Sequence, residues 1–113
     1  MEERKKVTKY YVASRASIPE RAAMWRRLRA DGLQITSTWI DEAGDGETDD
    51  FTRLWVRIVA EIASSHALIL YAEKADFPLK GALIEVGIAI GLSLPIYVCL
   101  PGLNLRLRKN WRN

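Results

Sequence analysis

The chain has 113 residues, of which 49% are hydrophobic and 27% are charged, the balance of one globular domain spanning residues 1–113. This composition excludes a disordered chain, a collagen-like repeat and a disulfide scaffold. Seventeen Lys and Arg against fourteen Asp and Glu give a net charge of +3. That mild surplus suits anionic small molecules, whereas a dedicated DNA-binding protein carries a dense basic stripe.

The single cysteine, Cys99, excludes an intrachain disulfide, so we expect a reducing, cytoplasmic compartment. No secretory signal is recognisable behind the charged start. Residues 81–105 carry a single charge, Glu85, over a length that is typical of a membrane span. Because glycines and Pro95 interrupt this stretch, we expect a buried helix followed by a buried strand and no membrane association.

Predicted strands and helices alternate along the chain. Their residue types and periodicity predict strands at 7–14, 33–39, 67–71 and 95–100, and helices at 17–30, 51–62 and 82–92. This order favours a parallel sheet with helices on both faces. Ligands of such sheets bind beyond the carboxyl ends of the strands, where the strand order reverses.

Two local features of the first predicted helix follow from its sequence. Ser17 and Glu20 have the spacing of a capping box at its start. Ala22 and Trp25 fall on its apolar face, which leaves Arg21 on the outer face.

Glu85 is the most informative residue, because an isolated carboxylate in an apolar segment is costly to bury without a purpose. We expect it in the first turn of its helix, where the helix dipole favours the ionised form. An ionised carboxylate in a partly dry pocket can attack an electrophilic sugar carbon. Alternatively, Glu85 caps its own helix or pairs with an arginine of the first predicted helix.

The segment from Gly81 to Leu92 (GALIEVGIAIGL) resembles the G-x-x-x-E-x-G-x-A signature of the nucleoside 2-deoxyribosyltransferase family. Residues 11–15 resemble the first strand of this family and the turn that follows it, and residues 35–41 are similar to the second strand of its small bacterial and phage-type members. The family includes related deoxynucleoside 5′-monophosphate N-glycosidases. The resemblance covers nearly the whole chain up to Gly102. It implies a flavodoxin-like three-layer sandwich with four or five parallel strands, and an enzyme that acts on N-glycosidic bonds.

The resemblance also implies roles for particular residues. Glu85 would be the nucleophile that forms a deoxyribosyl-enzyme intermediate, and Glu73 would contribute to catalysis. The family usually has an aspartate where this chain has Leu79, so the acid that protonates the leaving base stays open among Glu73, Asp76 and Asp41. The expected substrate-binding residues are Tyr11, Ser14, Arg15, Trp39, Asp41, Gly81 and Gly87.

Several alternatives remain beside this reading. The chain could be a catalytically idle nucleotide-binding module of the same fold that serves as a sensor or partner protein, or it could be related to NAD glycohydrolases.

No His or Cys spacing indicates a metal site, and we expect no cofactor. The resemblance implies a homodimer or larger homo-oligomer. The basic tail, residues 103–113, is typical of a solvated chain end, so nucleic-acid binding is not expected.

Overall fold

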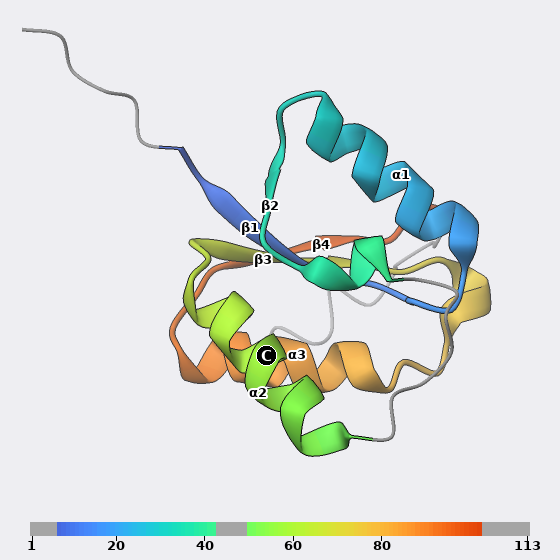
Figure 1. The fold of residues 1–113 in the computed structure, drawn as a ribbon. Helices are drawn as coiled ribbons and strands as arrows, with labels where there is room; N and C mark the ends of the chain where they lie inside the picture. The colour runs from blue at the N-terminus through green and yellow to red at the C-terminus, as the bar shows by residue number, and fades with distance from the viewer. Residues whose placement is uncertain (1–6, 43–49, 103–113) are drawn as a thin grey trace, which may run out of the picture.

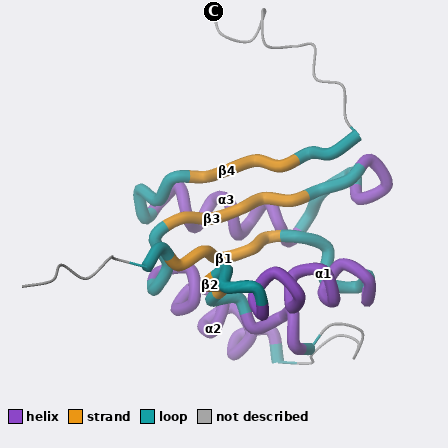
Figure 2. Tube along the Cα trace, turned by 90° about the horizontal axis from the view of Figure 1, so that it is seen from above, coloured by secondary structure: helices purple, strands orange, loops and turns teal. Residues whose placement is uncertain are grey.

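A computed structural model describes residues 7–42 and 50–102 and contains a four-stranded, all-parallel sheet. Its strands are β1 (Lys9–Ala13), β2 (Gln34–Ile35), β3 (Ala67–Tyr71) and β4 (Ile96–Cys99). They lie in the order β2-β1-β3-β4, as Figure 2 shows from above. The chain therefore reverses its direction of travel across the sheet between β1 and β3.

Helices cover both faces of the sheet (Figure 1). Helix α1 (Pro19–Ala30) lies on one face, and helices α2 (Phe51–Ala63) and α3 (Gly81–Gly91) lie side by side on the other. Two short 3-10 helices, η1 (Thr38–Asp41) and η2 (Lys74–Asp76), follow β2 and β3. The predicted flavodoxin-like three-layer α/β sandwich is confirmed, with four strands in the described part of the chain.

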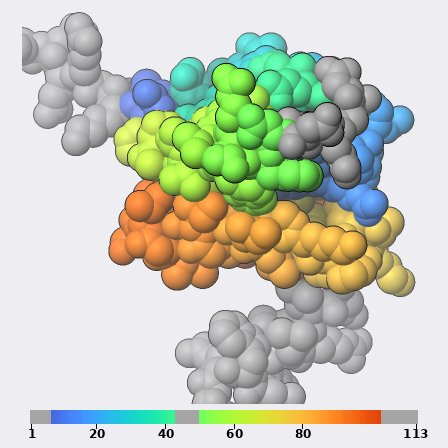
Figure 3. Space-filling model, turned by 60° about the horizontal axis from the view of Figure 1, so that its bottom comes forward, coloured from blue at the N-terminus to red at the C-terminus, as the bar shows by residue number. Residues whose placement is uncertain are grey.

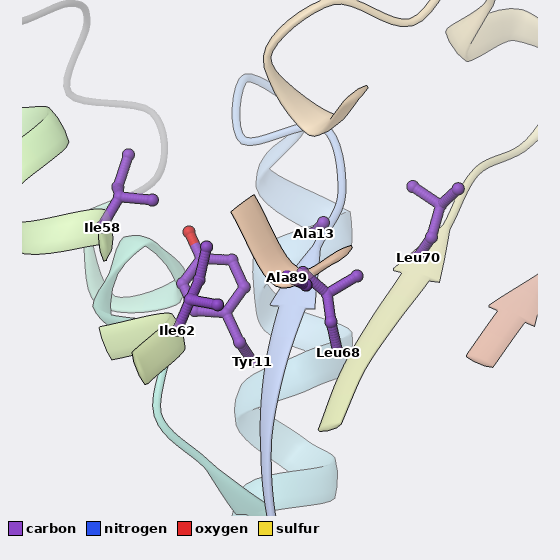
Figure 4. Packing of buried hydrophobic residues seen from close by; sticks show 7 residues of the cluster. All are labelled: Tyr11, Ala13, Ile58, Ile62, Leu68, Leu70 and Ala89. Carbon is purple, nitrogen blue, oxygen red and sulfur yellow. The ribbon is translucent and has the colours of Figure 1, made fainter. Parts of the chain in front are cut away.

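The core has one layer on each side of the sheet. Between the sheet and helices α2 and α3, a cluster of buried residues surrounds the fully buried Tyr11 (Figure 4). On the opposite side, Val12, Trp25 and Ile40 form the centre of a second cluster beneath α1. Because neighbouring side chains of a strand point to opposite faces, Tyr11 and Val12 contribute to different layers. Tyr11 thus stands on the α2 and α3 side.

The second strand is shorter than its alternating sequence predicts. Strand β2 ends at Ile35, because side chains of the following segment form the hydrogen bonds with the β1 backbone that a longer strand would form. The Val12 amide donates to the Ser37 hydroxyl at 3.1 Å, and the Trp39 indole donates to the Val12 carbonyl at 2.7 Å. These two bonds pair the backbone amide and carbonyl of Val12, so β1 needs no longer ladder of backbone hydrogen bonds with β2. They also place Trp39 over the end of β1.

Two expectations for α1 are wrong. The helix begins at Pro19 with Ile18 in the capping position, and the Ser17 hydroxyl accepts from the Arg15 side chain at 3.3 Å instead. Arg21 is buried, with 5% of its surface exposed, because it binds groups of two loops beneath the helix. Trp25 is buried as predicted.

The apolar stretch beyond residue 81 forms helix α3 and strand β4, but the expectation that both are buried is wrong. Ala89 is the one fully buried residue of α3, and most of β4 is exposed because it is an edge strand of the sheet. In residues 7–42 and 50–102, no helix has the length and apolar character needed to cross a membrane. The basic tail lies outside the described residues. Gly87 and Gly91 of α3 are exposed, and a Cβ atom at either position would meet nothing within 4 Å.

Candidate functional site

A large cavity opens beside the carboxyl ends of β1 and β3, where the strand order reverses. Its volume is about 1340 Å³, above the roughly 300–1,000 Å³ usual for small-molecule sites. It lies between the β1–α1 loop, helix α2 and the loop that leads into α3. The wall includes Tyr11, Ser14, Arg15, Trp39, Gly81 and Glu85 from the predicted site, and Arg53, Arg57, Glu61, Asp76 and Lys80.

The centre of the site is the contact between Glu85 on α3 and Tyr11 on β1. Glu85 is half-buried, and its carboxylate accepts a hydrogen bond from the Tyr11 hydroxyl. Burial is the main cause that raises the pKa of Glu85 to about 7. Burial and the Glu85 charge also raise the pKa of Tyr11, so the phenol stays protonated and donates. Tyr11 therefore orients a carboxyl group that changes its charge near neutral pH.

Two sequence expectations for Glu85 are corrected here. Helix α3 begins at Gly81, so no acidic residue lies in its first turn and Glu85 lies one turn inside. The helix terminus consequently does not keep this carboxyl group in the ionised form, and desolvation dominates. The arginines of α1 that form described bonds have partners other than Glu85. Arg21 binds Asp76, Arg26 binds the Ile40 carbonyl and Arg29 binds Asp41.

A second carboxylate, Glu61 on α2, faces the same cavity and was not identified from the sequence. Its side chain is 15% exposed. One oxygen accepts from the Thr38 amide at 3.1 Å, and the other accepts from the Thr38 hydroxyl at 2.6 Å. The Nε atom of Arg57, one helical turn earlier, lies 3.8 Å from Glu61. The charge of Glu61 is a further cause of the raised pKa of Glu85.

A buried ion pair joins the two loops at the edge of the cavity. Arg21 donates to Asp76 at 2.8 Å and to the Ser14 hydroxyl at 3.0 Å, and both charged side chains are nearly inaccessible. Asp76 also accepts from the Glu73 amide at 2.8 Å. Hydrogen bonds from Arg21 and the Glu73 amide outweigh burial and lower the pKa of Asp76. An ionised, paired Asp76 is poorly suited to donate a proton to a leaving base.

Cationic and aromatic side chains complete the wall. Arg15 bonds the Ser17 hydroxyl and, at 3.4 Å, the Ala75 carbonyl, which keeps its guanidinium between the two loops. Trp39 is partly buried, and its indole nitrogen is committed to Val12. Trp55 is also partly buried and lines the cavity from α2. This combination suits an anionic ligand that carries an aromatic ring.

Three residues proposed from the sequence do not line the cavity. Glu73 has a 48% exposed side chain, accepts from the Tyr71 hydroxyl and lies 3.5 Å from Arg21. Asp41 forms a two-bond ion pair with Arg29 on the surface, which lowers the pKa of Asp41. Gly87 lies on the outer side of α3. The structure thus separates Glu73 and Asp41 from Glu85.

No protein-family model matches the chain, and no curated protein matches its sequence. No cluster of three or more His, Cys, Asp or Glu residues suited to a metal ion occurs in the described ranges. What the geometry offers is a carboxyl group with a pKa near 7, a tyrosine that orients it, and a second carboxylate in one large cavity. Pairs of carboxyl groups in different environments are typical of acid–base and nucleophilic chemistry at sugar carbons.

Proposed function

We propose that this protein cleaves the N-glycosidic bond of 2′-deoxynucleosides or their 5′-monophosphates and passes the deoxyribosyl group to water or to a second base. The observation that carries the proposal is the Glu85 carboxylate, held by Tyr11 in the wall of a cavity at the strand-order reversal. The segment around Glu85, which resembles deoxyribosyltransferases, supports the same conclusion. The cations Arg15, Arg53 and Lys80 in the wall favour substrates with a 5′-phosphate.

The reaction proceeds in two displacements at the anomeric carbon. An ionised Glu85 oxygen attacks C1′ while the C1′–N bond breaks, and the bonding electron pair leaves with the base, which takes up a proton. The sugar is then bound to Glu85 as an ester. Water or the nitrogen of a second base attacks C1′, loses a proton and releases Glu85 as the carboxylate. Tyr11 holds the reacting oxygen in place throughout, which lowers the orientation cost of the attack.

The first test is a chromatographic assay with deoxynucleosides and their 5′-monophosphates, with and without free adenine. We expect base release or base exchange whose kcat/KM rises about tenfold per pH unit below 7 and levels off above it, because only ionised Glu85 attacks. If no substrate of the panel reacts while a deoxynucleotide still raises the melting temperature, the idle nucleotide-binding module replaces this proposal.

We also propose that the protein forms a homodimer through the outer face of α2 and α3, which lie side by side in Figure 3. Large apolar side chains are exposed there, namely Phe51, Val56 and Val59 on α2 and Leu83, Ile84 and Ile90 on α3. Gly87 and Gly91 leave open space among them. Small residues beside large ones allow a helix of a second copy to approach closely, which explains glycines that pack against nothing in their own chain.

Substituting Gly87→Leu tests this interface. The change fills open space in the monomer and removes a glycine from a helix, so we expect a monomer more stable by about 0.5–1 kcal/mol. It should also block the approach of the second copy, so the mass in solution falls from dimer to monomer. Ala30→Leu on exposed α1 is the control and keeps the dimer. A wild-type protein that is monomeric at micromolar concentration contradicts the interface.

A further inference from the structure

The site contains a second acidic side chain that neither the sequence motif nor the proposed nucleophile accounts for. Glu61 occupies the buried stripe of α2, one turn beyond Ile58 and next to Ile62, where an apolar residue is normal. A charge kept at such a position is costly unless its environment satisfies it. Thr38 and Arg57 supply that environment, since they bind or face both carboxylate oxygens.

We propose that Glu61 is a positioning residue of the site, which acts through its fixed negative charge on Glu85 and on a cationic group bound between α2 and α3. The two hydrogen bonds from Thr38 prevent Glu61 from turning toward the substrate as a nucleophile. Its charge, by contrast, reaches across the cavity without contact. Under the function proposed above, the cationic group is the sugar ring, which gains positive charge as the glycosidic bond breaks.

The electrostatics of the cavity agree with this role. Of the groups around Glu85, Tyr11 lowers its pKa through the hydrogen bond, and Glu61 raises it. Arg57 of α2 faces Glu61 and shares the wall with Glu85. Strands β3 and β4 turn apolar side chains toward α3. The remaining charged side chains of the wall are Arg15, Glu42, Asp50, Arg53, Asp76 and Lys80. Glu61 therefore makes Glu85 more basic and a better nucleophile once it is ionised.

The test is an NMR titration of the ligand-free protein with carboxyl-labelled glutamate, in which Glu85→Gln assigns the Glu85 signal. Glu61→Gln should lower the titration midpoint of Glu85 by about half a pH unit, the size expected for a partly screened unit charge across a cavity. Glu20→Gln is the control, because Glu20 is exposed in the first turn of α1 and does not line the cavity, and it should leave the midpoint unchanged.

A second variant keeps the test decisive if Glu61→Gln does not fold. Glu61→Met removes the same charge and places an apolar side chain in the buried stripe of α2, where one is normal, so the midpoint of Glu85 should again move down. An unchanged midpoint in either variant overturns the proposal and leaves Glu61 as an anchor for Thr38. Because this readout needs no substrate, it is independent of the assay for the proposed function. If that assay succeeds, Glu61→Gln should also lose about tenfold in kcat at pH 8.

Discussion

Glu85→Gln is expected to abolish turnover and, at pH 8, to make the fold more stable. Glutamine has nearly the shape of glutamate and still offers Tyr11 an acceptor oxygen, but it cannot form the ester with the sugar. Loss of an essential nucleophile reduces kcat by roughly 10³-fold or more. The gain in stability follows from the cost of keeping a charged carboxylate in this half-buried position.

The pH dependence of this gain has a definite sign. The folded protein holds the Glu85 proton up to about pH 7, whereas the ordinary value is 4.5. Between these values the folded state binds more protons than the unfolded chain, so its stability falls as the pH rises through 7. The full difference is about 3 kcal/mol. Glu85→Gln should therefore match the wild type near pH 4.5 and exceed it at pH 8.

Urea denaturation at pH 4.5, 6, 7 and 8 measures this difference. Glu20→Gln, at an exposed position in the first turn of α1, is the control and should retain both turnover and the wild-type pH dependence. A Glu85→Gln variant whose stability is equal to that of the wild type at pH 8 would contradict the raised pKa. A variant that still releases base at the wild-type rate would remove Glu85 from the reaction.

Arg21→Met is expected to cost about 3–5 kcal/mol of folding free energy, because it leaves the buried Asp76 carboxylate without its cation. The Arg21 side chain is 5% exposed and that of Asp76 is 2% exposed, so water cannot replace the lost partner. The change also releases the Ser14 hydroxyl. The two loops that border the cavity should separate, with loss of substrate binding as well as stability.

A surface ion pair of the same chemistry provides the matched control. Arg29 and Asp41 also make two hydrogen bonds, but their side chains are 39% and 45% exposed. Arg29→Met should therefore cost less than about 1 kcal/mol. Chemical denaturation of both variants at pH 7 gives the comparison. Equal losses of unfolding free energy in Arg21→Met and Arg29→Met would mean that burial does not determine how much the Arg21–Asp76 pair contributes to stability.

The layer architecture could be predicted because it depends on local periodicity. The alternation of apolar runs and amphipathic stretches set the order of strands and helices, and each predicted helix and strand is present. The length of β2 could not be predicted in this way. It depends on Ser37 and Trp39 reaching the backbone of Val12, about 25 residues away in sequence, and such contacts leave no periodic signal.

The site was predictable only in part for a similar reason. Glu85 stood out because it is the single charge in an apolar segment, and it lines the same cavity as Tyr11, Ser14 and Arg15. Arg21 and Asp76 are 55 residues apart, and only the fold shows that they pair. Glu61 was missed although a signal existed: it interrupts the apolar stripe of α2, as Glu85 interrupts the apolar character of α3.

The most direct test of the account is the mass of the protein during turnover. Wild-type protein mixed with a deoxynucleoside or deoxynucleotide that it cleaves is quenched in acid, digested and analysed by mass spectrometry. The account predicts one added deoxyribosyl group on the peptide that carries Glu85, and none in Glu85→Gln. Base release from a protein whose Glu85 peptide never gains the sugar would contradict the covalent intermediate and indicate direct attack by water.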